Sequence, residues 1–223
     1  NENGTYVWQW LKNPPKEEDY HPPDTDDTMR VRLVVEKALR RGFEVPGEFE
    51  HFDYKEFLLP LMADDGAICT YIRDSHSGSC PIVNTNILQA LTLIGGHDEI
   101  RSKIKGYLEN VADSASFDPD IFTEQSRYYI SPLFPVYVLS KTIATDPDLF
   151  STEEQQRVLE YAKRITPKNV LERAWQSSIL KYFGKESSAT ELSFDYIPIF
   201  RSRKLRESYG SNSATAIFCL EGR

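Results

Sequence analysis

The stretch "PLFPVYVLSKTI", residues 132–143, decides the fold because it is apolar on almost every side. A helix without a polar face has to contact protein all round. The sequence therefore predicts a buried helix here, in an inner layer of the protein.

Helical periodicity continues in both directions from this stretch, and more buried segments alternate with amphipathic ones. The more buried segments are 28–41, 83–94 and 132–144, and the amphipathic ones are about 53–62, 99–111 and 152–163. Two concentric helical layers require this alternation, because inner helices contact protein on both sides. We therefore expect an all-α protein with an (α/α) toroid, a partial α/α barrel of inner and outer helices. An irregular helical bundle is the alternative.

Local patterns mark the ends and faces of several predicted helices. In 28–41, Val31, Val34, Val35 and Ala38 share one face, which we expect to be buried. The sequence Ser151-Thr152-Glu153-Glu154 has the spacing of a capping box at the start of a helix. Only 192–200 resembles a strand, and Pro198 weakens that prediction.

The length, composition and net charge of the chain limit its possible domain organisation and class of protein. The chain has 223 residues, of which 40% are hydrophobic, and a net charge of −8. This length allows a single domain over residues 1–223, whether alone or within a longer protein. The negative charge argues against a nucleic-acid partner, which would need clustered Lys and Arg.

The cysteines indicate the compartment. Cys69, Cys80 and Cys219 are scattered and lack a CxxC spacing. This pattern indicates a reducing environment, and the predicted location is therefore cytoplasmic. The cysteines and histidines are also not spaced as zinc ligands. No apolar run approaches 18 residues, so no membrane-spanning helix is expected.

Three carboxylates crowd the start of the first predicted helix, in "HPPDTDDTMRV", residues 21–31. Asp24 can cap the helix, with Asp26 and Asp27 in its first turn, where the helix dipole favours negative charge. A chemical role is the alternative, because a carboxyl flanked by another carboxylate tends to stay protonated. The spacing alone leaves both interpretations open.

Several stretches together resemble a known family. "DTDDT", residues 24–28, looks like the DxDD(T) motif of class II terpene cyclases. Weaker similarities to the prenyltransferase and squalene-hopene cyclase repeats, which form an (α/α) toroid, are "NGTYVWQW", "VNTNILQAL", "RYYISPLFPVYVLS" and "YGSNSATAIFCLEG". The repeat pattern of Gln followed six residues later by Trp is absent. About nine predicted helices also fall short of the twelve in a closed toroid.

The resemblance implies an enzyme that protonates a prenyl chain and so starts its cyclisation or isomerisation. The middle residue of the motif, Asp26, is then the proton donor, oriented by Asp24 and Asp27 and with His21 as a further partner. Ring faces can stabilise the resulting cation. The rings expected to line the substrate cavity, with core packing as their alternative role, are Trp8, Trp10, Tyr71, Tyr128, Tyr129 and Tyr137.

The same resemblance implies the partners. An isoprenoid is the expected substrate, and the family adds a second helical domain or subunit and a peripheral membrane contact. No cofactor or bound metal is expected, except Mg²⁺ if the substrate is a diphosphate. Asp64-Asp65-Gly66 lacks the last aspartate of a DDxxD magnesium motif.

Two other functions stay open. A non-catalytic toroid, acting as a binding or partner domain, would leave the aspartate triplet exposed to solvent. A carbohydrate-active (α/α) barrel would place two carboxylates about 5–10 Å apart in an open cleft.

Overall fold

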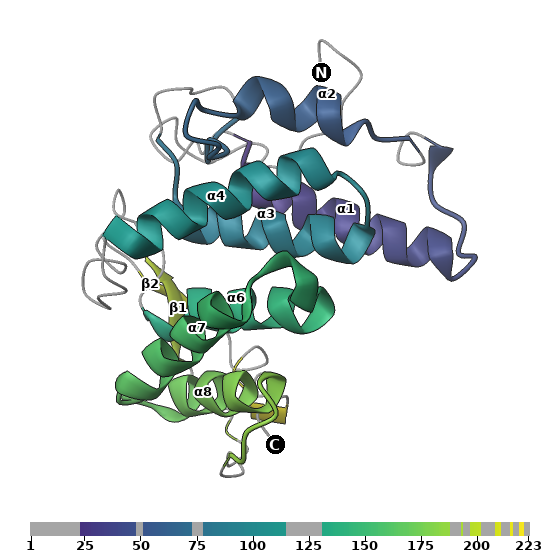
Figure 1. The fold of residues 1–223 in the computed structure, drawn as a ribbon. Coiled ribbons are helices and arrows are strands. Elements are labelled where there is room, and N and C mark those ends of the chain that lie inside the picture. The colour runs from purple at the N-terminus through teal and green to yellow at the C-terminus, as the bar shows by residue number, and fades with distance from the viewer. Residues whose placement is uncertain are drawn as a thin grey trace. The chain divides into compact units, whose positions relative to one another are not determined.

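A computed structural model describes residues 23–47, 51–72, 78–114, 131–187, 193, 197–201, 208–210, 215 and 219–220. The chain divides into two compact units, Asn1–Asn110 (unit 1) and Val111–Arg223 (unit 2), which we describe separately (Figure 1). The described residues are mostly helical, with one pair of short strands. The predicted all-α class is thus confirmed in outline, whereas the single-domain organisation stays a prediction.

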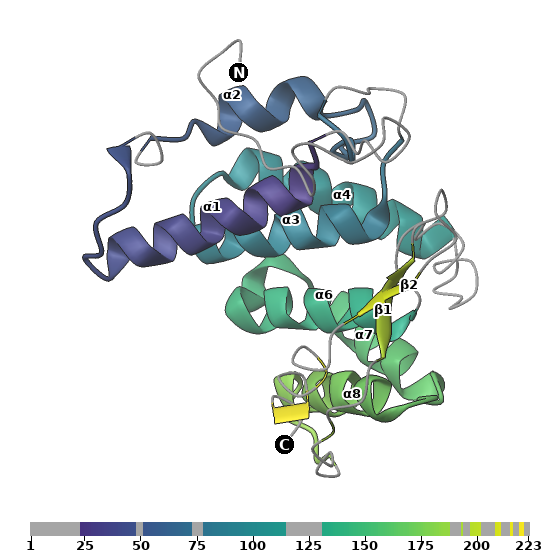
Figure 2. The ribbon, with the colours of Figure 1, turned by 180° about the vertical axis from the view of Figure 1, so that it is seen from behind.

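The described residues of unit 1 form four α-helices and one 3₁₀ helix. They are α1 (Thr25–Arg40), α2 (Tyr54–Leu58), η3 (Leu59–Leu61), α3 (Pro81–Ile94) and α4 (Asp98–Ser114), whose last turn passes the boundary with unit 2. Helices α1 and α3 lie side by side in both views of the ribbon (Figures 1 and 2). This pairing brings the aspartate triplet on α1 next to the first turns of α3.

Helix α3 is the buried helix of unit 1, as its sequence predicts. Pro81 occupies its first position, where a missing backbone N–H costs nothing. Ile82, Val83, Ile87 and Leu91 are no more than 2% exposed. We expect the Val, Ile and Leu side chains of 83–94 to be almost wholly buried, and all of them are buried except Leu93, which is half-buried.

Helix α1 buries a different face from the predicted one. Val34 is 66% exposed, so the prediction that Val31, Val34, Val35 and Ala38 form a buried face is wrong. The buried side chains of α1 are Thr25, Asp26, Thr28, Met29 and Arg32. Polar contacts from the first turn to neighbouring segments turn this face inward, and they outweigh the valine stripe.

Side-chain contacts hold α2 against α1. The Tyr54 hydroxyl donates a 2.9 Å hydrogen bond to Glu36. The Arg32 guanidinium lies 4.7 Å from the centroid of the Phe52 ring, within the range of a cation–π interaction. Burial raises the pKa of Tyr54 to about 12, so its hydroxyl stays a donor at neutral pH.

In its described residues, unit 2 combines a helical group with a pair of short strands. The elements among its described residues are α6 (Leu133–Thr145), the 3₁₀ helix η4 (Pro147–Leu149), α7 (Thr152–Arg164), α8 (Val170–Tyr182), β1 (Pro198–Arg201) and β2 (Ser208–Gly210). Helix α6 packs against both α7 and α8. The two strands are antiparallel. Pro198 is the first residue of its strand, a position that tolerates the missing N–H.

Helix α6, which contains most of the fold-deciding stretch, is buried as predicted. Leu133, Val136, Val138 and Ile143 are no more than 7% exposed. Ser140 and Thr142 are buried too, and their hydroxyls donate to the carbonyl oxygens of Val136 and Val138 in the preceding turn. Both hydroxyls thus have a hydrogen-bond partner within the helix, so these two polar residues can be buried in a helix that has no polar face.

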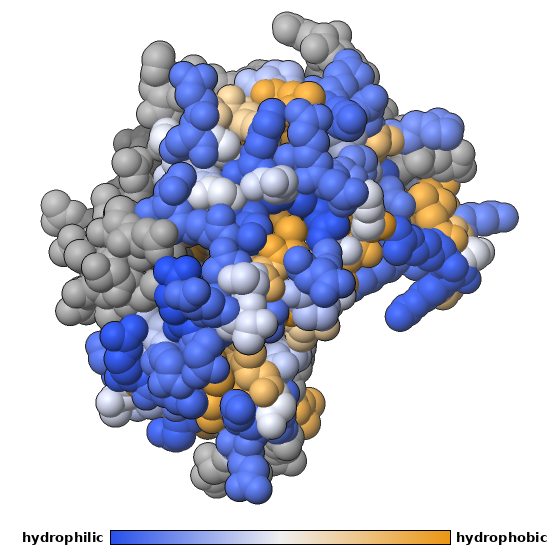
Figure 3. All heavy atoms as spheres, viewed as in Figure 1, coloured by the Kyte–Doolittle hydropathy of each residue, from blue (hydrophilic) through white to orange (hydrophobic). Residues whose placement is uncertain are grey.

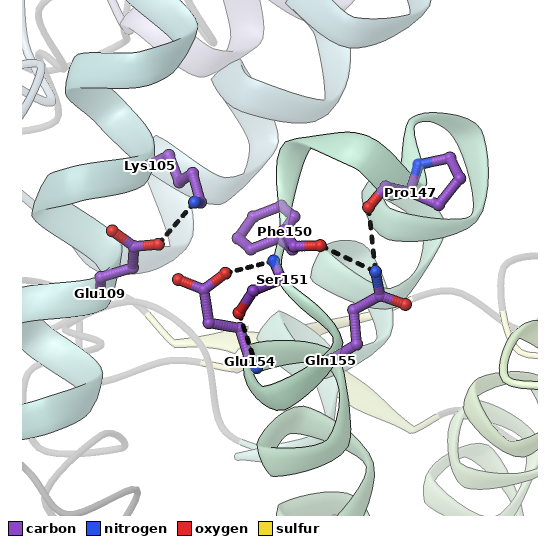
Figure 4. A network of polar contacts seen from close by, with 7 residues as sticks. All are labelled: Lys105, Glu109, Pro147, Phe150, Ser151, Glu154 and Gln155. Atoms are coloured by element: carbon purple, nitrogen blue, oxygen red, sulfur yellow. Dashed lines mark hydrogen bonds and ion pairs between the residues drawn. The ribbon is translucent and has the colours of Figure 1, made fainter.

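The predicted capping box at the start of α7 is confirmed. The Ser151 hydroxyl accepts from the Glu154 backbone N–H, and the Glu154 carboxylate accepts from the Ser151 backbone N–H (Figure 4). The Gln155 amide donates to the carbonyl oxygens of Pro147 and Phe150, which ties η4 to the new helix. Figure 4 also draws a pair within α4, in which Lys105 and Glu109 lie 2.8 Å apart.

The surface is mainly polar on the face drawn in Figure 3, with small apolar groups between hydrophilic side chains. Among the described residues, the exposed large apolar side chains are Val34, Phe43, Leu59 and Leu220. None of the helices in the described part of the chain is both long and apolar enough to cross a membrane.

Candidate functional site

Asp24 is the N-cap of α1, as the capping interpretation predicts. Its backbone is extended, and its Oδ1 atom accepts a 3.0 Å hydrogen bond from the Asp26 backbone N–H. Asp26 and Asp27 follow in the first turn, where the dipole of the helix stabilises negative charge. The triplet thus stabilises the start of the helix, whatever else it does.

Asp26 has a partner that capping does not require. Its side chain is only 5% exposed, and its Oδ2 atom accepts a 2.7 Å hydrogen bond from the Nδ2 atom of Asn86 on α3. Capping and dipole effects need no contact with a second helix. A buried carboxylate needs such a donor, because burial without hydrogen bonds costs several kcal/mol. The Asp26 carboxylate is therefore held in place by a specific hydrogen bond from α3.

Arg30 extends this contact to the surface of the helix. It lies one turn after Asp26 on α1, and its Nη2 atom donates a 2.7 Å hydrogen bond to the Oδ1 atom of Asn86. The Asn86 amide therefore bridges a guanidinium and a carboxylate, with one side group at each end. The Asn86 side chain thus links Arg30 to Asp26.

The segment 68–72 runs along the other side of the triplet. The Thr25 backbone N–H donates to the Thr70 carbonyl oxygen, and the Thr25 hydroxyl donates to the Cys69 carbonyl oxygen. Asp24 forms an antiparallel backbone bridge with Tyr71. Tyr71, one of the predicted cavity residues, thus lies directly beside the triplet.

Asn84 fixes this segment to α3. Its side-chain amide accepts from the Ile68 backbone N–H and donates to the Ile68 carbonyl oxygen, at 2.7 and 3.0 Å. It also donates to the Cys80 carbonyl oxygen. Residues two apart in a helix project to nearly opposite sides, so Asn84 holds segment 68–72 while Asn86 faces α1.

Loss of the Asn84 amide should destabilise unit 1 measurably. In Asn84→Ala the buried N–H and carbonyl groups of Ile68 lose their partner, so we expect the free energy of unfolding to fall by about 2 kcal/mol. Thr85→Ala is the matched control, because the Thr85 hydroxyl bonds only to Pro81 of its own helix. Urea unfolding followed by circular dichroism measures both. Equal losses in the two variants would contradict this role of Asn84.

Electrostatics keep part of the triplet neutral. Burial raises the pKa of Asp24 far above its usual range, and the negative charge of Asp26 and a side-chain hydrogen bond to Asp26 raise it further. Burial, followed by the charge of Asp26, raises the pKa of Asp27 to about 6, against the opposing effect of Arg30. The Asp24 carboxyl therefore keeps its proton to a higher pH than an exposed aspartate does.

Of the other predicted cavity residues, the structure describes Tyr137, which belongs to unit 2. Tyr137 is 3% exposed within unit 2, where its ring centroid lies 6.4 Å from that of Trp175 and 6.3 Å from that of Tyr182. Tyr137 therefore packs in the core of unit 2, which is the alternative role given above for these rings. The remaining predicted positions lie outside the described residues: Trp8, Trp10, His21, Tyr128 and Tyr129.

Asn86 and Arg30 belong to the site although no sequence motif identifies them. A signal exists for Asn86, because a polar residue in a helix buried on all sides must have a hydrogen-bond partner. Arg30 stands four residues after Asp26, a spacing at which side chains on a helix meet. Neither signal indicates which residue Asn86 or Arg30 contacts.

The described residues were also compared with the pattern of a metal site. No three His, Cys, Asp or Glu side chains gather there as a set of metal ligands. In the Asp64-Asp65-Gly66 turn, the Asp65 carboxylate instead accepts from the Ala67 backbone N–H.

Comparisons with known proteins leave the site to be interpreted from its own geometry. No protein-family model, curated protein or solved structure matches this chain. The function proposed next therefore depends on the buried carboxyl pair and its partners.

Proposed function

We propose that this chain starts the cyclisation or isomerisation of a prenyl chain by protonating an alkene or epoxide, with Asp26 as the acid. One observation carries the proposal: Asp26 is buried, paired with Asp24 and held by the Asn86 amide. Capping a helix needs none of these features. The DxDD resemblance supplies the substrate class.

The chemistry follows from the groups around Asp26. An alkene is a very weak base, so its acid must leave behind a well-stabilised carboxylate. The Asn86 amide donates one hydrogen bond to this carboxylate. In the step itself the O–H bond of Asp26 breaks. With an alkene, the proton and the π electrons form a C–H bond, and the positive charge stays on the neighbouring carbon. With an epoxide, the proton binds the ring oxygen, whose C–O bond breaks and leaves the positive charge on that carbon. Solvent then returns the proton.

The proposed fold around this site is an (α/α) toroid or part of one. The buried helices α3 and α6 alternate along the chain with α4 and α7, and each of the latter has an exposed side. This order supports two helical layers. A second helical domain or subunit, a peripheral membrane contact, and Mg²⁺ for a diphosphate substrate belong to the same proposal.

The burial of Asp26 weighs against the two other functions. A non-catalytic binding domain predicts an exposed triplet, which the 5% exposure of Asp26 does not support. A carbohydrate-active barrel needs carboxylates separated by a substrate or a water molecule. Asp24 and Asp26 instead share a side-chain hydrogen bond, so they do not make such a pair.

Asp26→Asn is the test of the proposal. We expect this nearly isosteric change to lower product formation at least about 100-fold, because it removes the general acid. The purified chain is incubated with farnesyl diphosphate or geranylgeranyl diphosphate in the presence of Mg²⁺, and separately with squalene. Mass spectrometry of the extracted products measures the outcome.

Asp53→Asn is the matched control, since Asp53 also caps a helix but is exposed. It should form product like the wild type. Equal product from wild type and Asp26→Asn would remove Asp26 as the acid. A wild type that forms no product from any of the three substrates would contradict the proposed reaction.

A further inference from the structure

We propose that an open pocket in unit 1 binds a small phosphate ester whose organic part carries a flat ring. The pocket has a volume of about 430 Å³ and lies between the start of α2 and the turn that joins α3 to α4. This volume lies in the range of small-molecule sites, about 300–1,000 Å³. The residues that line the pocket are His51, Phe52, Asp53, Tyr54, Lys55 and His97. None of them belongs to the aspartate site, so this proposal does not depend on the proposed reaction.

Aromatic rings form one wall of the pocket and join its two segments. The Tyr54 ring is buried, and its centroid lies 4.8 Å from that of Phe52 and 4.8 Å from that of the His97 imidazole. The Tyr54 hydroxyl already donates to Glu36 on α1, so Tyr54 offers a ligand only its ring. Phe52 and His97 are half-buried, and part of each side chain is open to the pocket. A flat ring of a ligand can pack against this wall.

The hydrogen-bond donors of the pocket match a phosphate group. The Lys55 ammonium is a cation, and the imidazoles of His51 and His97 each keep at least one N–H donor in either protonation state. A phosphate monoester presents three terminal oxygens and a charge of about −1.5 to −2 at neutral pH. Three donor side chains therefore correspond to three acceptor oxygens, whereas a carboxylate would present only two.

Two of these donors are available to a ligand. Lys55 and His51 are exposed, and neither side chain makes a hydrogen bond or an ion pair with any residue in the described part of the chain. Formation of a complex would therefore break no interaction of these two groups. A lysine without a carboxylate partner beside an aromatic wall also keeps its full charge for an anion.

The carboxylates nearest the pocket in sequence have other partners. Asp53 lines the pocket, but its Oδ1 atom accepts from two backbone N–H groups of α2 as the cap of that helix, and we assign it no contact with the ligand. Asp98 and Glu99, which follow His97, pair with cations one turn further along α4, each at 3.1 Å. These acids therefore do not neutralise Lys55.

The test is a titration of ¹⁵N-labelled protein with phenyl phosphate, followed through the backbone amide resonances of residues 51–55 and 97. We expect these resonances to shift and to saturate below about 10 mM probe. Lys55→Gln should weaken binding at least about five-fold, because it removes the cation that pairs with the phosphate. The absence of a saturable shift in the wild type would overturn the proposal.

Lys37→Gln is the matched control. Lys37 on α1 is also exposed, but it does not line the pocket. Its loss changes the net charge by the same amount and should alter the affinity less than about two-fold at physiological salt, where distant exposed charges are screened. If Lys37→Gln weakens binding as much as Lys55→Gln does, general electrostatic attraction explains the binding and the proposed site is wrong.

A second probe and a second variant test the aromatic wall. Phenyl phosphate should bind at least about three-fold more tightly than inorganic phosphate, because its ring packs on the wall. His97→Asn removes the imidazole ring, but it keeps a donor and a residue type that tolerates the φ of +59° at this position. This variant should lose most of that preference and still bind inorganic phosphate. Equal affinity of the wild type for both probes would overturn the ring-bearing ligand.

Discussion

Asp24→Asn should stabilise the protein by about 3 kcal/mol at pH 8 and leave its stability nearly unchanged at pH 4. Asparagine caps a helix as well as aspartate does, so the start of α1 is kept. The amide can also donate to Asp26 where protonated Asp24 does so in the wild type. The substitution therefore removes the ionisable group and leaves its contacts in place.

The direction follows from the raised pKa of Asp24. Burial, with the charge of Asp26, raises this pKa from 3.8 to about 10 in the folded chain. As the pH rises through this window, the unfolded chain releases the proton and the folded chain retains it. Ionisation then favours the unfolded state, and wild-type stability falls. Asparagine has no ionisable group, so the stability of Asp24→Asn does not fall in this way as the pH rises.

Urea unfolding between pH 4 and pH 8 checks this prediction. Asp53→Asn is the control, because Asp53 accepts from the Lys55 and Glu56 backbone N–H groups as an exposed cap. It should change the free energy of unfolding by less than about 0.5 kcal/mol at either pH. A difference between Asp24→Asn and wild type that does not grow with pH would show that Asp24 is an ordinary exposed carboxylate.

Gly66→Ala should destabilise unit 1 by about 3 kcal/mol or more. Gly66 has a φ of +87°, which L-residues rarely adopt, and a Cβ atom built there would lie 2.5 Å from the Lys103 carbonyl oxygen. That oxygen belongs to the backbone of α4, so it cannot rotate away. The turn would have to leave the helix, and the segment 68–72 beside Asp24 follows directly after it.

Gly42→Ala separates the clash from the backbone strain. Gly42 has a φ of +75°, and no atom lies within 4 Å of the place that an alanine Cβ would take, so only the strain of about 1–2 kcal/mol applies. Thermal and urea unfolding of both variants measure the difference. If Gly66→Ala costs no more than Gly42→Ala, the turn is not packed against α4 as described.

Several local features could be predicted from the sequence because they depend on neighbouring residues. The unbroken apolar pattern of 132–143 predicted a buried helix, and α6 is buried. The Ser151–Glu154 spacing predicted the capping box of α7. Asp24 stands directly before a helical pattern, and it caps α1. Caps and the sides of a helix are set within a few residues, so a short stretch is enough to determine them.

The amino-acid sequence by itself thus determined the helices, their caps and the crowding of three carboxylates at one helix start. Tertiary structure decided which face of α1 is buried, and it chose the polar first turn over the valine stripe that includes Val34. It also joined Asp26 to Asn86, which are 60 positions apart. Periodicity shows that a side chain is buried, but its partner depends on how two helices pack. Only that packing turns a capping motif into a carboxyl pair held by an amide and Arg30.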